Sequence, residues 1–187
     1  MGARIFIDTV TKLDLKARPF VAHLDSGARI TADAVILATG AQARWLELPS
    51  EEKFKGFGVS ACATCDGFFY RGREVMVIGG GNTAVEEALF LTNFASKVTL
   101  VHRRDSLRAE KILQERLFKN PKVSVIWDHE VVEVQGDEAP LGVTQVLLRS
   151  TKTGAEQTVP ADGVFVAIGH APASELVAGQ LELHHGG

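Results

Sequence analysis

The sequence predicts an α/β fold with a parallel β-sheet and an attached β-meander. Three observations support this prediction. Strand and helix patterns alternate between residues 74 and 127, a glycine-rich loop follows the first of these strands, and short strand-like runs return over residues 130–160. Alternation of strands with helices is typical of a parallel sheet, whereas short runs separated by turn residues are typical of an antiparallel meander.

The N-terminal part of the chain predicts a further antiparallel meander that ends in a buried strand. Arg4–Ile7 and Phe20–Leu24 are rich in strand-forming residues, and Asp25–Gly27 supplies a turn. Ala34–Leu37 is a continuous apolar run of the kind that is buried in a sheet. Residues 41–58 contain a proline and two glycines, which indicates a linker.

A βαβαβ unit follows the linker. Its elements are the strand Glu74–Ile78, a helix over 82–94, the strand Lys97–Val101, a helix over 106–119 and the strand Val123–Trp127. Ile112, Leu113 and Leu117 lie on one face of the second helix, which Asn120-Pro121 ends. The meander over 130–160 then turns at Thr153-Gly154.

An internal similarity links the two halves of the chain. Asp33–Gly40 and Asp162–Gly169 share an aspartate, an apolar strand pattern and then alanine and glycine at matched offsets. This predicts that two nucleotide-binding domains are closed in the same way. A glycine-rich loop precedes only the second copy.

Composition restricts the function classes. The hydrophobic share of 45% and the charged share of 23% are those of an ordinary globular protein. The net charge of −3 gives no electrostatic case for nucleic acid or an anionic membrane surface as a partner. No apolar run approaches the roughly 20 residues that span a bilayer, and the first residues lack the apolar stretch of a secretory signal. We therefore expect a cytoplasmic protein that binds neither nucleic acid nor membranes.

The loop after Glu74–Ile78 fits the dinucleotide-binding pattern G-x-G-x-x-A, here Gly79, Gly80, Gly81, Asn82, Thr83 and Ala84. Gly79 permits the tight turn, Gly81 lets the backbone approach a pyrophosphate, and Ala84 allows close packing of the helix on the strand. The phosphates are expected at the helix N-terminus, where free N–H groups favour anions. The alternative is a purely structural glycine turn.

The end of the next strand indicates which dinucleotide is bound. An NAD enzyme places an acidic residue there to bind the ribose hydroxyls, whereas this chain has His102, Arg103 and Arg104, with Arg108 in the same loop. Guanidinium groups suit the oxygens of a 2′-phosphate. We therefore predict NADP(H) rather than NAD(H), and the alternative is a set of solvated surface arginines.

The two cysteines, Cys62 and Cys65, form a C-x-x-C motif that is followed by Asp66. In a cytosolic protein such a motif points to redox chemistry or to half of a metal site. Asp66 would donate a proton to a departing thiolate if burial raised its pKa. A zinc site would need two more ligands from His23, His102, His129, His170, His184 or His185, and none of these is paired at the usual spacing. We expect no metal, and chemically inert cysteines are a further alternative.

Three segments, Ser60–Tyr70, Gly79–Glu87 and His102–Asp105, closely resemble bacterial, low-molecular-weight thioredoxin reductases in sequence, order and spacing. This resemblance implies a homodimeric flavoprotein in which electrons pass from NADPH through FAD to the C-x-x-C disulfide and on to thioredoxin. It implies that Cys65 faces the flavin, that Cys62 exchanges with thioredoxin and that Asp66 is the general acid. It also implies that Arg103, Arg104 and Arg108 bind the 2′-phosphate and that the glycine loop binds the pyrophosphate.

The resemblance also predicts the domain organisation: a Rossmann-like NADP-binding domain flanked by partial FAD-domain segments. Residues 1–43 correspond to a remnant of the FAD domain, 44–170 to the NADPH-binding domain with the C-x-x-C motif, and 171–187 to the start of the return into the FAD domain. The family's N-terminal glycine-rich FAD motif and C-terminal Gly-Asp segment have no counterpart here. The alternatives are an NADP(H)-binding module without catalysis and an NADH-dependent peroxiredoxin reductase, the alkyl hydroperoxide reductase flavoprotein.

Overall fold

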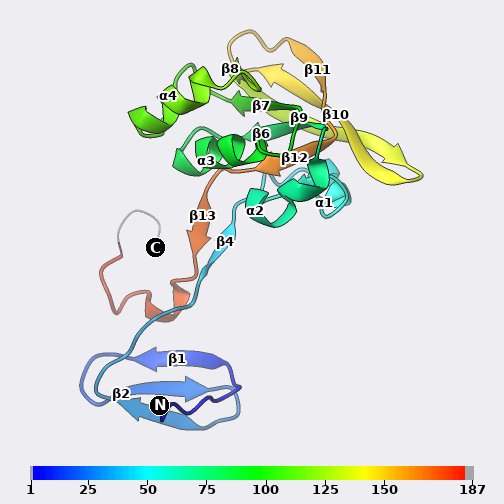
Figure 1. Ribbon diagram of the computed structural model, residues 1–187. Helices are drawn as coiled ribbons and strands as arrows, with labels where there is room; N and C mark the ends of the chain where they lie inside the picture. Colours follow the sequence, from blue (N-terminus) through cyan, green and yellow to red (C-terminus); the bar gives the residue numbers. More distant parts are fainter. Residues whose placement is uncertain (1, 184–187) are drawn as a thin grey trace. The chain divides into compact units, whose positions relative to one another are not determined.

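The computed structural model describes residues 2–183, which form two compact units (Figure 1). The first unit contains the residues up to Gln42 together with those from His170 onward, and the second contains Ala43–Gly169. Two short strands, β4 (Ala41–Ala43) and β13 (His170–Pro172), form a two-stranded sheet where the chain passes from one unit to the other. In the described residues no helix has the length and apolar character needed to cross a membrane.

The first unit is built on a three-stranded antiparallel sheet. Its strands are β1 (Val10–Asp14), β2 (Phe20–Leu24) and β3 (Arg29–Ala32), in the order β1-β2-β3. The predicted turn between the second and third strands is confirmed, since the N–H of Gly27 donates to the carbonyl of Leu24 at 2.9 Å. Leu13 and Leu24 are buried together with Val177 of the 3-10 helix η2 (Glu175–Val177).

Two predicted strands of this unit are wrong. Neither Arg4–Ile7 nor Ala34–Leu37 has strand structure, and Ile36, predicted to be buried, is 94% exposed. An apolar run becomes a buried strand only where neighbouring strands accept its backbone hydrogen bonds and other elements cover its side chains. None of the described residues pairs with either run in a sheet.

The second unit contains a five-stranded sheet with the order β5-β12-β6-β7-β8, in which all neighbouring strands are parallel. The strands are β5 (Val59–Ser60), β6 (Glu74–Ile78), β7 (Lys97–His102), β8 (Val123–Trp127) and β12 (Gly163–Val166). The predicted parallel sheet is therefore confirmed, and Asp162–Gly169 contains a strand as predicted whereas its counterpart Asp33–Gly40 does not.

Both faces of this sheet are covered, as Figure 1 shows. Successive side chains of a strand point to opposite faces. Val75 and Val77 therefore pack against the helices α3 (Asn82–Leu91) and α4 (Lys111–Lys119). Met76 and Ile78 pack against the helix α1 (Pro49–Phe54) and the antiparallel meander of β9 (His129–Glu138), β10 (Leu141–Ser150) and β11 (Glu156–Pro160).

Three helical elements of this unit differ from the sequence-based prediction. The first predicted helix ends at Leu91 rather than at residue 94. The predicted linker contains α1, whose first turn holds Pro49 and which anchors Phe54 in the core, so the start signal of a helix was present there. The second predicted helix begins at Lys111 rather than at residue 106. Of the three residues that were predicted to share one face of this helix, Leu117 is buried and Leu113 is half-buried, but Ile112 is 52% exposed.

Gly163 shows how tightly the sheet packs against the segment that follows the C-x-x-C motif. A Cβ at this position would lie 2.1 Å from the ring of Tyr70, which belongs to the 3-10 helix η1 (Gly67–Tyr70). We expect Gly163→Ala to lower the free energy of unfolding by about 1–3 kcal/mol, because the ring must be displaced. Urea unfolding measures this change. The matched control is Gly142→Ala in β10, where the nearest atom would be 3.9 Å away, and an equal loss in both variants would contradict the steric explanation.

Candidate functional site

A pocket of about 550 Å³ lies in the second unit where β6 and β7 end. β6 ends at Ile78 and α3 begins at Asn82, so the glycine loop lies directly at the helix N-terminus, where N–H groups have no partner within the helix. Seven of the predicted cofactor residues line this pocket: Gly79, Gly80, Gly81, Thr83, His102, Arg103 and Arg108. Asn82, Ala84 and Arg104, which were also predicted, do not line it.

Each glycine of the loop meets a different requirement. Gly79 has φ +155°, and a Cβ there would lie 2.3 Å from the carbonyl oxygen of Ala167 and 2.7 Å from the Cβ of Ala84. A Cβ at Gly80 would lie 2.2 Å from the ring of His102. Gly81 has open space in the same direction, which leaves its backbone accessible to a ligand. The loop therefore fits against the end of β7 and the residue that follows β12, and it presents its third glycine to the pocket.

The segment 103–110, here called the arginine loop, is fixed to the glycine loop by its backbone. The N–H of Arg108 donates to the carbonyl of Gly80 at 2.8 Å, and the N–H of Glu110 donates to Oδ1 of Asn82 at 2.8 Å. Asn82 therefore holds the arginine loop in place. These bonds keep the segment out of helical geometry, which explains why α4 begins at Lys111.

The other end of the arginine loop is held by the meander. The hydroxyl of Thr151 donates to the carbonyl of Arg103 at 3.3 Å, and the N–H of Asp128 donates to the carbonyl of Arg104 at 3.3 Å. Among the described residues, none of the three arginines makes an ion pair. The loop thus has a fixed backbone and three positive charges that acidic side chains leave unneutralised, which suits a phosphate group.

His102 is buried at the end of β7, and its Nε2 atom has no hydrogen-bond partner among the described residues. Burial lowers the pKa of His102 below its ordinary value, and the positive charges of Arg104 and Arg108 lower it further. The ring is therefore neutral near pH 7. It supports the glycine loop by direct packing against Gly80.

The lowered pKa of His102 predicts a pH dependence of stability. At pH values between the ordinary pKa of histidine, near 6.5, and the lowered pKa of His102 in the folded chain, His102 binds a proton in the unfolded chain but not in the folded one. The free energy of unfolding is therefore expected to fall as the pH decreases below about 6.5. Urea unfolding of the wild type and of His102→Gln at several pH values between 5 and 8 measures this effect. The variant should lose less stability on acidification, and equal losses would contradict the assignment.

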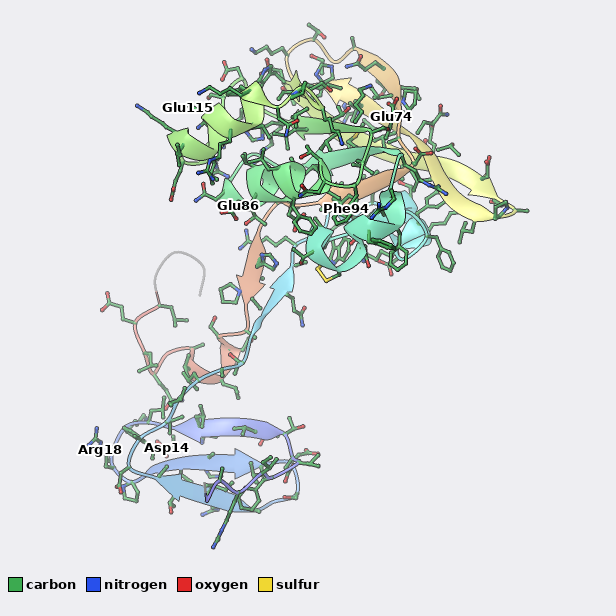
Figure 2. All side chains as sticks on the ribbon, viewed as in Figure 1. Asp14, Arg18, Glu74, Glu86, Phe94 and Glu115 are labelled. Carbon is green, nitrogen blue, oxygen red and sulfur yellow. A yellow bond between two sulfur atoms is a disulfide. The ribbon has the colours of Figure 1, made fainter. Side chains whose placement is uncertain are left out.

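The C-x-x-C motif lies between β5 and η1. Cys62 is the N-cap of the short helix α2 (Ala63–Asp66), and its Sγ accepts a hydrogen bond from the N–H of Cys65. The two cysteines form a disulfide, visible as the yellow bond in Figure 2. Ala63 between them is fully buried, whereas Cys65 is exposed and Cys62 is half-buried. A disulfide at the surface of a short, anchored helix is accessible to an exchanging thiol.

The third predicted residue of this motif, Asp66, is half-buried and accepts a hydrogen bond from the hydroxyl of Ser60. The zinc alternative gains no support from the residues described: both cysteines are in the disulfide, and no group of three or more His, Cys, Asp or Glu side chains gathers in residues 2–183. Two of the histidines considered for zinc, His184 and His185, lie outside the described residues.

Sequence reasoning missed two kinds of residue. The first is a set of further residues that line the pocket: Arg44, Leu46, His129, Glu130, Val131, Ile168 and Gly169. These residues come from the start of the unit, from the meander and from the segment after β12, and no local pattern connects them. The second is Ser60, whose position two residues before Cys62 was a usable signal.

Comparison with known proteins gives a consistent result. Residues 2–187 match the pyridine nucleotide-disulphide oxidoreductase family. The chain is 56% identical over 183 residues to a thioredoxin reductase of Rickettsia felis, covering 98% of this chain and 59% of the relative. It is 54% identical over 186 residues to the thioredoxin reductase of Escherichia coli O157:H7, covering 97% of this chain and 57% of that protein.

Solved structures agree with these relatives. A thioredoxin reductase of Lactococcus lactis has a TM-score of 0.83 and 40% identity, covering 92% of this chain and 56% of that structure. One from Giardia duodenalis has a TM-score of 0.85 and 37% identity, covering 100% and 60% respectively. The chain thus spans less than two thirds of the length of the relatives that it matches.

Proposed function

Because the chain belongs to the pyridine nucleotide-disulphide oxidoreductase family, we propose that it is the part of a thioredoxin reductase that binds NADP(H) and contains the redox-active disulfide. The observation that supports this proposal best is the joint presence, in one unit, of a glycine loop, a surface disulfide and an arginine loop whose arginines have no ion-pair partner among the described residues. The relatives named thioredoxin reductase support the same conclusion.

The pocket residues fit NADP(H). The pyrophosphate is proposed to bind at Gly79, Gly80, Gly81 and the first turn of α3. Arg103 and Arg108, which line the pocket, and the neighbouring Arg104, which does not, are proposed to bind the 2′-phosphate. The neutral His102 packs beneath the loop, where its ring lies against Gly80 and supports the backbone that would bind the phosphates. When bound, NADPH supplies a hydride, which is the two-electron equivalent that a disulfide reduction requires.

The disulfide motif is proposed to act in exchange with thioredoxin. Cys62 is proposed to attack the thioredoxin disulfide and Cys65 to resolve the resulting mixed disulfide. Asp66 is proposed to hold and deliver the proton that a departing thiolate needs. Cys65 is the more exposed of the two residues, so the division of roles between them rests on the resemblance.

FAD is a different case, because the described residues do not by themselves form a flavin site. In the first unit Ala34–Leu37 belongs to no sheet and Ile36 faces outward. We therefore derive no step through FAD. We propose flavin binding, homodimerisation and a cytoplasmic location only for the protein that includes the rest of the relatives' length.

Binding and spectra of the purified chain test the proposal. Calorimetric titration is expected to show NADP⁺ binding at least about 30-fold more tightly than NAD⁺, the effect of about 2 kcal/mol of phosphate contacts. A preference for NAD⁺ would contradict the proposal and favour the NADH-dependent peroxiredoxin reductase. Absorbance spectra after incubation with FAD and desalting, followed by NADPH, show whether this chain alone binds a reducible flavin. NADP⁺ binding without retained flavin identifies an NADP(H)-binding module.

A further inference from the structure

Ser60 is a buried polar residue next to the disulfide motif. It is the last residue of β5, which pairs with β12 at the edge of the parallel sheet, and it is only 7% exposed. A hydroxyl in such a position is expected to have hydrogen-bond partners, because burying it without them costs free energy. Its partners show what the residue does.

The hydroxyl of Ser60 joins the acid and the backbone of the motif. It donates to Oδ2 of Asp66 at 2.6 Å and accepts a hydrogen bond from the N–H of Cys62 at 3.0 Å. Its contact with the carbonyl oxygen of Cys62 is longer, at 3.5 Å, so the carboxyl oxygen is the better acceptor of its proton. The N–H of Asp66 in turn donates to the carbonyl of Cys62 at 3.1 Å, which closes a ring of hydrogen bonds.

This ring fixes the direction of the Asp66 carboxyl group. A free aspartate side chain on a short surface helix rotates about two bonds, whereas the bond from Ser60 holds one of its oxygens against the sheet edge. The other oxygen, Oδ1, makes no hydrogen bond to the residues that the structure describes. Oδ1 is therefore the oxygen that remains available to hold an exchangeable proton.

We propose that Ser60 is a positioning residue that holds the Asp66 carboxyl in place for proton transfer to the cysteine pair. This inference rests on the proposed role of Asp66 as the general acid. It assigns a function to a residue outside the C-x-x-C-D motif and makes the end of β5 part of the redox site.

The chemical step can be written with a dithiol reductant, which requires neither flavin nor NADPH. A thiolate of the reductant forms a bond to Sγ of Cys62, the disulfide bond breaks, and its electron pair leaves on Sγ of Cys65. That sulfur takes the proton from Asp66. The second thiol of the reductant loses its proton to restore Asp66, attacks the mixed disulfide and leaves Cys62 as a thiolate, while the reductant becomes a cyclic disulfide.

The test measures the rate of reduction of this disulfide by dithiothreitol at pH 6–7 in the chain as it is. We expect Ser60→Ala to slow the reduction by about fivefold, a part of what a positioned acid contributes. Ser60→Thr retains a hydroxyl and is expected to stay within about twofold of the wild type. Asp66→Asn is expected to be slowed at least as much as Ser60→Ala, and the double variant Ser60→Ala/Asp66→Asn no more than Asp66→Asn alone.

A matched control is Thr99→Val, which removes a buried hydroxyl from β7, where Thr99 contacts Ser124 and no residue of the motif. It is expected to leave the rate unchanged. An additive effect of Ser60→Ala and Asp66→Asn, a failure of threonine to restore the rate, or an unchanged rate in Ser60→Ala would each overturn the proposal.

The same experiment separates this inference from the proposed function. If Asp66→Asn is as fast as the wild type, the proposed acid role of Asp66 fails, and the role of Ser60 fails with it. If Asp66→Asn is slow and Ser60→Ala is fast, only the inference about Ser60 fails. Binding of NADP⁺ does not enter the measurement, so a failure of the cofactor assignment leaves this result interpretable.

Discussion

Replacing either cysteine with serine is expected to abolish the reduction of thioredoxin by this chain, with a rate loss of about a thousandfold or more. A serine hydroxyl forms no disulfide and is a far weaker nucleophile than a thiolate at neutral pH. The measurement begins with the chain reduced by dithiothreitol and freed of it. Oxidised thioredoxin is then added, and its newly formed thiols are counted over time. The wild type should transfer two electrons per chain and yield free, fully reduced thioredoxin. Cys62→Ser and Cys65→Ser should yield none, since a single remaining cysteine stops at a mixed disulfide with thioredoxin.

The controls for this result come from the neighbouring residues. Thr64→Ala removes the hydroxyl that lies 3.4 Å from Sγ of Cys62 but keeps both sulfurs, and it is expected to retain the rate within about threefold. NADP⁺ binding by both cysteine variants should stay within about twofold of the wild type, because neither cysteine lines the dinucleotide pocket. Release of fully reduced thioredoxin by either serine variant would contradict the proposed redox role.

The parallel sheet could be predicted from the sequence because its strands are buried on both faces. Glu74–Ile78 and Val123–Trp127 have the predicted bounds. A short, continuous apolar run that is bounded by glycine, proline or charged residues is typical of a strand buried on both faces. The same reasoning failed for Ala34–Leu37. Its pattern is that of a buried strand, but burial depends on neighbours, and the described residues provide none in a sheet.

In the candidate site too, some residues could be predicted from the local sequence and others only from the tertiary structure. The glycine loop and the arginines follow from local pattern, because a turn and a strand end have characteristic residues. The start of α4 does not, because hydrogen bonds that the backbone N–H groups of the arginine loop donate to Gly80 and Asn82 hold residues that would otherwise continue the helix. Arg44 also required tertiary structure, since the other residues that line the pocket come from distant parts of the unit. Ser60 did not, because its partners Cys62 and Asp66 lie within six residues of it.

Removing Arg103 and Arg104 together is expected to weaken NADP⁺ binding by roughly a hundredfold while leaving NAD⁺ binding nearly unchanged. Charge-assisted hydrogen bonds to a phosphate contribute about 1.5–3 kcal/mol each. Because both arginines are exposed, we use the lower value, and the resulting total of about 3 kcal/mol corresponds to a roughly hundredfold change in affinity. Because the backbone of the arginine loop is held by Gly80, Asn82 and Thr151, Arg103→Gln/Arg104→Gln should remove the charges without changing the loop. Calorimetric titration with both dinucleotides measures the two affinities.

Measuring the affinities for both dinucleotides makes this prediction specific, because the comparison distinguishes the loss of a contact with the 2′-phosphate from a general effect of lost positive charge. Arg116→Gln/Lys119→Gln removes the same charge from the exposed last turn of α4 and is expected to change NADP⁺ affinity by less than about threefold. Equal losses for NADP⁺ and NAD⁺ in the arginine-loop variant would mean that the arginines support the loop rather than read the 2′-phosphate. No loss for either would mean that they are solvated surface charges. A loss confined to NADP⁺ would place the 2′-phosphate against the two residues that follow β7, the position at which NAD enzymes of this fold carry an acid.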